Sequence, residues 1–278
     1  MIIRSWGSRG SIPVSGKEHI KYGGDTTCIE VTSSEGDTLI IDAGTGIRKL
    51  GNKLVQNDKK INIIFTHPHW DHLSGFPFFK PLYQEGRSIE VRGPRTTQES
   101  VKQIISHTMA PPFFPIDLDD IHADISFHST GPENFQMGSL YIKTIPINHT
   151  SKGVGYRIEE GGKSFVFLTD NELGHSHPYG LASGDYKKFA EGADVLFHDA
   201  EYTPDDYKDV KGWGHSVYLD ALELAHSSGV MEFGLFHHNQ DRDDIGIDAL
   251  VSDCERITKE KSLSMKCYGV SCETEIKL

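Results

Sequence analysis

The sequence HPHWDH at residues 67–72 decides how this chain folds and what it can bind. It follows an apolar run at residues 61–65, which predicts a buried strand that ends in a loop. In such a loop the first two histidines face one side, and the aspartate and last histidine face the other. That arrangement suits two neighbouring metal ions. A His-rich surface loop is the alternative, but four candidate ligands in six positions are rarely met by chance.

The candidate ligands in this stretch are imidazoles and one carboxylate, groups that zinc, manganese and iron accept. They are His67, His69, Asp71 and His72.

The bulk composition fits an ordinary globular enzyme. The chain has 278 residues, 37% hydrophobic and 24% charged, which suits one domain over residues 1–278. We see no apolar stretch of roughly 18 residues and no signal peptide, so we expect a cytoplasmic protein without membrane contact. The net charge of −12 opposes binding of a long polyanion. It does not exclude a small phosphate ester, because two metal ions would reverse the local charge.

The four cysteines favour a reduced, cytoplasmic protein. A redox pair formed by Cys267 and Cys272 is the alternative, although their spacing matches no familiar metal or redox motif.

Short apolar segments bounded by turn residues predict strands, and longer amphipathic segments predict helices. The expected strands are 2–6, 28–32, 38–42, 61–65, 89–91, 140–146, 155–159, 164–169, 195–198 and 233–236. The expected helices are 47–56, 96–108, 186–191, 217–227 and 244–258, the last two capped by Ser216 and Asp244. This order predicts an α/β protein with helices outside its sheets. Residues 109–120 are apolar and proline-rich, and we expect a packed loop there rather than a lid.

Three further candidate ligands follow predicted strands: His149, Asp170 and His237. Each has a simpler interpretation, since a histidine after a strand is often a surface residue and an aspartate is often a turn residue. Their shared position beside residues 67–72 favours a common metal site. His238 is the rival of His237, which we prefer because it continues the alternation of Phe233 and Leu235.

Taken together, these residues resemble the metallo-β-lactamase superfamily over nearly the whole chain. The resemblance implies a four-layer αββα sandwich with the metals at one edge of its two sheets. It implies two divalent ions, with zinc as the expected metal and manganese or iron as alternatives. An aspartate between the two ions is similar to the hydrolase branches in which both metal positions are filled. The implied ligands are His67, His69 and His149 for the first metal, Asp71, His72 and His237 for the second, and Asp170 for both.

The sequences GSRGSIP at 7–13, YGGDTTC at 22–28 and LIIDAGTG at 39–46 are similar to the ribonuclease Z and phosphodiesterase branch. In that branch Asp42 would hydrogen-bond a ligand histidine and fix its tautomer. A plain turn aspartate is the alternative.

Two late motifs, FHDAEY at 197–202 and GHS at 214–216, resemble the acidic residue and histidine with which this branch aids phosphodiester cleavage. Here the pair would be Asp199 and His215. The branch has glutamate where this chain has aspartate, and Glu201 stands nearby, so the resemblance leaves open which carboxylate orients His215. A histidine near a helix start, with no catalytic role, is the simpler alternative.

The resulting hypothesis is a phosphodiesterase that uses a hydroxide bound by two metals. Asp71 would steer that hydroxide, and His215, held by Asp199, would protonate the leaving oxygen. We expect a small phosphodiester such as a 3′,5′-cyclic nucleotide, because the chain lacks the basic arm with which ribonuclease Z proteins grip transfer RNA.

Other functions and assemblies stay open from the sequence. The alternatives are a ribonuclease Z-like RNA endonuclease, a thioester or lactone hydrolase, a binding protein with a relic site, and a redox diiron protein. We expect no long nucleic acid and no membrane as partner. A homodimer is one possible assembly.

Overall fold

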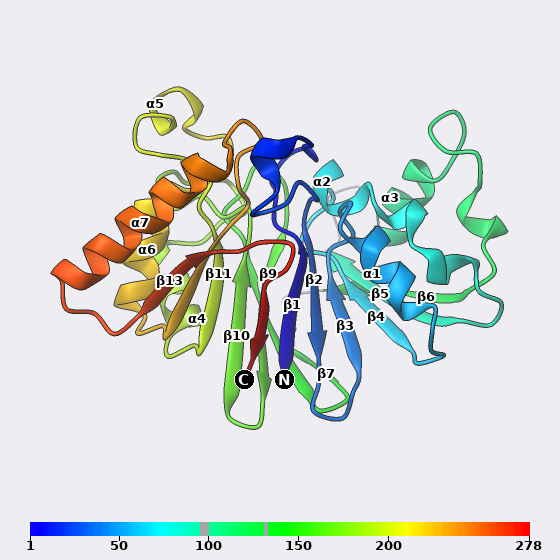
Figure 1. Cartoon of the computed structure of the whole chain (residues 1–278). Coiled ribbons are helices and arrows are strands. Elements are labelled where there is room, and N and C mark those ends of the chain that lie inside the picture. Colours follow the sequence, from blue (N-terminus) through cyan, green and yellow to red (C-terminus); the bar gives the residue numbers. More distant parts are fainter. Residues whose placement is uncertain (95–99, 131–132) are drawn as a thin grey trace.

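The protein, described by a computed structural model over residues 1–94, 100–130 and 133–278, contains two seven-stranded sheets packed face to face (Figure 1). The first sheet has the order β14 (Glu275–Lys277), β1 (Ile2–Gly7), β2 (Cys28–Thr32), β3 (Thr38–Ile41), β4 (Ile61–Ile64), β5 (Ser88–Pro94), β6 (Asp124–Thr130). The second has the order β13 (Lys266–Gly269), β12 (Glu232–Phe236), β11 (Val195–Asp199), β10 (Lys163–Leu168), β9 (Val154–Glu160), β8 (Leu140–Pro146), β7 (Phe135–Met137).

Helices cover the outer face of each sheet (Figure 1). The first sheet packs against α1 (Ile47–Leu54) and α3 (Val101–Thr108). The second packs against α4 (Ser183–Ala190), α6 (Tyr218–Ser227) and α7 (Asp244–Glu260). A third apolar cluster fills the space between the sheets. The predicted four-layer αββα sandwich is therefore confirmed.

Alternate residues of one strand supply two different cores, because successive side chains of a strand point to opposite faces. In β3, Ile40 packs under the helices and Ile41 packs between the sheets. In β10, Val166 packs under the helices and Phe167 packs between the sheets. Strands covered on both faces are apolar throughout, which explains the short continuous runs seen in the sequence.

The strand directions bring one set of strand ends together. Strands β3 to β6 are parallel, and so are strands β10 to β13. Two antiparallel pairings, β8 with β9 and β9 with β10, give β8 the same direction as β10. Ligand sites in such sheets lie outside the carboxyl ends of the strands. This is the upper edge in Figure 1, where the short helix α2 (Trp70–Leu73) lies.

The predicted strands are all present, with ends that differ by a few residues. The prediction missed β6, β7, β13 and β14. Strands β7 and β14 have three residues each and are partly or fully exposed, so they carry little apolar signal. The helix predicted at 96–108 begins at Val101, and its first residues, 96–99, lie outside the described residues.

Both predicted helix caps were wrong. Asp243 caps α7 by accepting a hydrogen bond from the Gly246 backbone nitrogen at 2.7 Å. Helix α6 has Val217 as its N-cap, without a side-chain cap. The Ser216 hydroxyl instead donates to the carbonyl oxygen of Asn171, a contact between distant parts of the chain.

Residues 67–72 are also less loop-like than predicted, because Trp70–Leu73 forms α2. In the segment 109–120, Met109 and Leu118 are buried, whereas Phe113 is exposed. Only its last part, the 3-10 helix Leu118–Asp120, is regular, as expected for a packed loop.

Two sequence expectations concern the environment of the chain. Among the described helices, none combines the length and the apolar composition needed to cross a membrane. All four cysteines are free, so Cys267 and Cys272 form no disulfide. That the chain forms one domain stays a prediction.

Candidate metal centre and adjoining cleft

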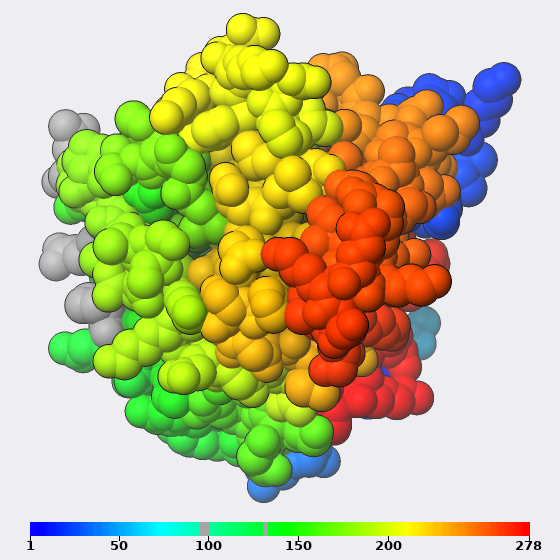
Figure 2. Space-filling model, turned by 90° about the vertical axis from the view of Figure 1, so that its left-hand side faces the viewer, coloured from blue at the N-terminus to red at the C-terminus, as the bar shows by residue number. Residues whose placement is uncertain are grey.

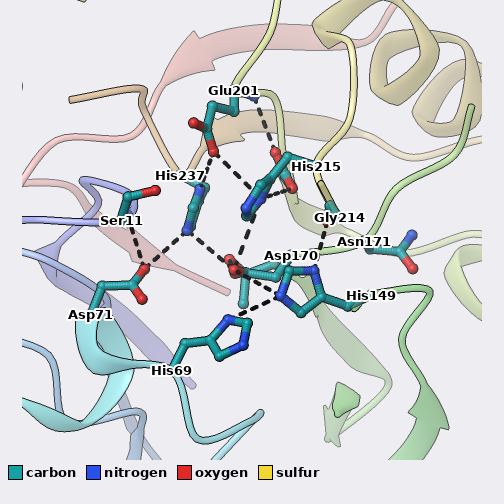
Figure 3. A network of polar contacts seen from close by, with 12 residues as sticks. Ser11, His69, Asp71, His149, Asp170, Asn171, Glu201, Gly214, His215 and His237 are labelled. Atoms are coloured by element: carbon teal, nitrogen blue, oxygen red, sulfur yellow. Dashed lines mark hydrogen bonds and ion pairs between the residues drawn. The ribbon is translucent and has the colours of Figure 1, made fainter. Parts of the chain in front are cut away.

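The candidate ligands come from both sheets and meet at the edge where the parallel strands end. His67 follows β4, His149 follows β8, Asp170 follows β10, and His237 follows β12. Asp71 and His72 lie in α2, and His69 is the residue before it. Figure 3 shows Asp170 at the centre, with imidazole rings of the other elements pointing toward it.

The backbone at this edge is unusual. Asp42, Asp170 and His237 each follow a strand with a positive φ, of 62°, 51° and 57°. Positive φ is uncommon for residues other than glycine, although Asp, Asn and His tolerate it best. Strained backbone of this kind clusters at functional sites, where the surrounding structure holds it in place.

The first group of ligand atoms lies on one side of Asp170. Its Oδ2 atom is 3.5 Å from His67 Nε2 and 3.9 Å from His149 Nε2. His69 Nδ1 lies 3.1 Å from His149 Nε2.

The second group lies on the other side of Asp170. His72 Nε2 is 3.1 Å from Asp71 Oδ2 and 3.3 Å from Asp170 Oδ1. His237 Nε2 is 3.1 Å from Asp71 Oδ2 and 3.3 Å from Asp170 Oδ2. Asp170 thus belongs to both groups, as a bridging ligand would.

The donor set fits divalent metal ions. Within each group the ligand atoms lie within 4.8 Å of one another. Two ligands of one ion, each at roughly 2.1 Å from it, are separated by about 3–4 Å. Among the described residues, buried His67 Nε2 has no hydrogen-bond partner, an uncommon situation that a bound cation would relieve.

The opposite ring nitrogen of several candidate ligands is held by a hydrogen bond. His72 Nδ1 donates to Asp42 Oδ2 at 2.8 Å, and His149 Nδ1 donates to the Gly214 carbonyl at 2.9 Å. His237 Nδ1 donates to Glu201 Oε2 at 2.9 Å. Such bonds fix the tautomer and leave Nε2 for a metal. Asp42 therefore lies where the sequence placed it, against a candidate ligand.

The electrostatics of the two groups differ. Burial lowers the pKa of His149 to about 3 and also lowers the pKa of His67, so these rings are neutral and able to bind a metal. Burial has the same effect on His72, but the carboxylates of Asp71 and Asp170 outweigh it and raise its pKa well above the usual value. Carboxylates that stabilise a proton at this position would also stabilise a cation.

His237 and His238 lie in different environments. His237 faces the centre, whereas the His238 ring packs against Tyr22 and its Nε2 hydrogen-bonds the Val270 carbonyl at 2.7 Å. The reason given for preferring His237 does not hold, because β12 ends at Phe236 and the positive φ of His237 interrupts the alternation.

His215 lies beside this centre, 3.9 Å from Asp170 through its Nδ1 atom. The same atom is 2.9 Å from Asp199 Oδ2 and 3.4 Å from Glu201 Oε2. Asp199 is therefore the carboxylate that orients His215, while Glu201 holds His237. Burial would lower the pKa of His215, but the charges of Glu201 and Asp199 raise it to about 9.

Glu172 is a site residue that the sequence argument missed. It is fully buried and accepts hydrogen bonds from Tyr207 Oη, His177 Nε2 and the backbone nitrogens of Gly212 and Gly214, at 2.5 to 2.8 Å. It thereby fixes the segment that carries the Gly214 carbonyl and His215. A carboxylate two residues after the strand-terminal Asp170 was the available signal.

Gly214 is required at its position. It has a φ of +102°, and a Cβ atom there would lie 2.1 Å from His149 Nδ1. Only glycine allows the backbone to approach the imidazole so closely.

A cleft of about 770 Å³ opens beside His215 and Glu201. Its walls come from residues 201–215, around α5 (Tyr207–Val210), and from residues 239–246 at the start of α7. These segments lie next to each other at the top of Figure 2, coloured yellow and orange. The cleft has the size of a small-molecule site.

The similarity to known proteins agrees with this geometry. The family profile described as "Beta-lactamase superfamily domain" matches residues 37–238. Ribonuclease Z of Haloarcula marismortui is 22% identical over 278 residues, covering 83% of this chain and 84% of the relative. The metallo-beta-lactamase fold protein YhfI from Bacillus subtilis has a TM-score of 0.71 at 17% identity and covers 99% of both chains. Unliganded yeast PDE1 has a TM-score of 0.70 at 14% identity, over 100% of this chain and 99% of its own. At such identities the structural likenesses establish the fold alone.

Proposed function

The chain belongs to the β-lactamase superfamily, and from this membership we propose that it is a two-metal phosphodiesterase acting on a small phosphodiester. The observation that carries the proposal is the His215–Asp199 pair, joined at 2.9 Å beside seven clustered candidate ligands. A thioester or lactone hydrolase of this fold would need the metals but not this pair.

The seven residues divide into the two groups described above. We propose His67, His69 and His149 for one ion, Asp71, His72 and His237 for the other, and Asp170 for both. Zinc is the proposed metal, with manganese and iron as alternatives that the same ligands accept. Divalent ions bound there would activate water and neutralise charge on the phosphate.

Asp71 is held in one orientation, from which it can direct the attacking water. Its Oδ2 atom accepts a hydrogen bond from the Ser11 backbone nitrogen at 3.0 Å. A carboxylate fixed in this way can orient the attacking water toward the phosphorus.

In the proposed reaction, His215 protonates the leaving oxygen. Because its Nδ1 atom donates to Asp199, the proton available for transfer is the one on Nε2. Asp199 is fully buried and also accepts a hydrogen bond from the Glu201 backbone nitrogen, so it holds the ring in one orientation.

The charge of the protein favours a small substrate. The whole chain carries −12, and the described lining of the cleft has five carboxylates against one guanidinium. A long polyanion would be repelled by such a surface. A 3′,5′-cyclic nucleotide is the first member of this class to assay. Assembly as a homodimer stays a prediction.

The test compares bis(p-nitrophenyl) phosphate with p-nitrophenyl acetate on the metal-loaded protein. We expect turnover of the phosphodiester, and His215→Ala should lower it roughly 10²–10⁴-fold while the metal content stays constant. His226→Ala, in the last turn of α6, is the matched control and should have little effect. Preferred cleavage of the acetate, with no effect of His215→Ala, would instead support an ester or thioester hydrolase.

A ribonuclease Z-like endonuclease is the second candidate, because curated relatives carry that name. Cleavage of a transfer RNA precursor at a rate above that of small diesters would favour it. The acidic cleft argues for the opposite outcome.

A further inference from the structure

The cleft beside His215 contains a largely exposed aromatic side chain. Trp213 lines the cleft and is 64% exposed, although large aromatic side chains are usually well buried. It lines the same cleft as His215, so one substrate could reach both side chains.

The backbone that carries Trp213 is held firmly. Its own nitrogen donates to the Val210 carbonyl at 3.0 Å, and both neighbouring glycines donate to the buried carboxylate of Glu172. An exposed indole on an immobilised backbone is a preformed binding surface, because little conformational entropy is lost when a ligand stacks on it.

The charge around Trp213 is negative. Arg242, the one arginine or lysine among the described lining residues, pairs with Asp206 at 2.8 Å. Asp209 and Asp241 also line the cleft, and neither has a cationic partner within the described part of the chain. A positive group placed there would gain both charge attraction and a cation–π contact with the indole.

A largely buried histidine on the inner wall also indicates a ligand. His215 is only 9% exposed, and its Nδ1 atom is engaged by Asp199. No hydrogen bond to its Nε2 atom is found within residues 1–94, 100–130 and 133–278. The cleft therefore offers an unpartnered imidazole nitrogen at its inner end and an acidic, aromatic wall at its outer end.

On the basis of the phosphodiesterase function proposed above, we propose that the substrate is a zwitterionic phosphodiester whose second end carries an ammonium group. The phosphate lies at the metal centre next to His215, and the ammonium group lies over Trp213 beside Asp209 and Asp241. The two ends of the site then have opposite charge, as do the two ends of the substrate. An ammonium site narrows the substrate class within the phosphodiesters. Cyclic nucleotides carry no ammonium group, so we expect them to be poorer substrates than zwitterionic phosphodiesters.

Two synthetic substrates test the charge alone. Choline p-nitrophenyl phosphate carries a trimethylammonium group, and 3,3-dimethylbutyl p-nitrophenyl phosphate carries a tert-butyl group of the same shape. In each hydrolysis, water forms a P–O bond, the P–O bond to p-nitrophenol breaks, and the leaving oxygen takes up a proton. For the metal-loaded enzyme at low salt we expect kcat/KM to be about tenfold higher for the choline diester.

Variants locate the source of this preference. Trp213→Leu and Asp209→Asn should each reduce the ratio of the two kcat/KM values by roughly threefold or more. Asp205→Asn is the matched control, because Asp205 is exposed, pairs with Lys208 and does not line the cleft, and it should leave the ratio unchanged.

Binding supplies a readout that does not depend on turnover. Calorimetric titration of the metal-loaded enzyme should detect choline chloride and not 3,3-dimethylbutan-1-ol, and Trp213→Leu should weaken the choline signal. Equal hydrolysis of both diesters, together with no preference for choline, would overturn the ammonium site and leave the phosphodiesterase proposal standing. Absence of hydrolysis of either diester and of bis(p-nitrophenyl) phosphate would overturn the phosphodiesterase proposal itself.

Discussion

The metal centre and the outer wall of the cleft are built in opposite ways. In the centre, Asp42, His72 and Asp170 are almost completely buried, and their hydrogen bonds hold the rings in one orientation. On the outer wall, Trp213 is exposed and Asp209 has no cationic partner among the described residues. The centre is fixed before a ligand arrives, as catalysis requires, whereas the wall presents charge and an aromatic surface for selection.

The largest effect is expected from replacing Asp170, the residue shared by both ligand groups. Asp170→Asn should lower phosphodiester turnover by at least about a thousandfold, since residues that act as one unit show large single effects. Metal analysis by mass spectrometry should find fewer than two ions per chain. Full turnover with two bound ions would show that Asp170 does not join the two groups.

Removing a residue that only orients a ligand should have a smaller effect. Asp42→Asn takes away the carboxylate that accepts from His72 Nδ1, and we expect metal affinity to fall about 10–100-fold. Competition with a chelator would measure this loss. Asp37→Asn, on the turn before β3, is a matched control outside the centre and should bind metal as the unchanged protein does.

Glu172 connects the two regions, because it holds the segment between Trp213 and His215. An amide at this position cannot accept from every donor that Glu172 serves, so Glu172→Gln should lower kcat roughly tenfold with metal content intact. Tyr207→Phe removes a single one of these bonds and should have a milder effect. A change in KM alone would indicate that Glu172 acts on substrate binding rather than on the position of His215.

The smallest effect on kcat/KM is expected from a substitution in the outer wall of the cleft, assayed with a substrate that carries no cationic group. Asp209→Asn should raise kcat/KM for the anion bis(p-nitrophenyl) phosphate about twofold at low salt, because it removes a repelling charge. The gain should vanish near 1 M salt, where screening is nearly complete. A gain that persists at high salt would point to a change in shape rather than in charge.

The sequence predicted the sheets well where strands are buried on both faces. Strands such as β3, β4 and β10 are continuous apolar runs, so their positions were clear. Short and exposed strands such as β7 and β14 were missed, because three residues with few buried side chains carry little apolar signal. The pairing of β14 also depends on β1, at the other end of the chain. The prediction that Ser216 caps a helix failed because its hydroxyl donates a hydrogen bond to the carbonyl of Asn171, 45 residues away, rather than to its own helix.

Residue type and spacing by themselves determined the candidate ligands, because His67 to His72 lie within six consecutive residues and the other ligands each follow a strand. The order of apolar runs and amphipathic segments along the chain also predicted an α/β fold, because each of these signals is local. Tertiary structure alone decided which carboxylate meets which histidine: Asp199 with His215, Glu201 with His237, and Asp42 with His72. These pairs are 16 to 36 residues apart in the chain, and hydrogen bonding requires contact within about 3 Å, which only the packing of the two sheets can set. The same holds for Glu172 and for the acidic cleft around Trp213, whose residues come together only after α5 and the start of α7 have packed.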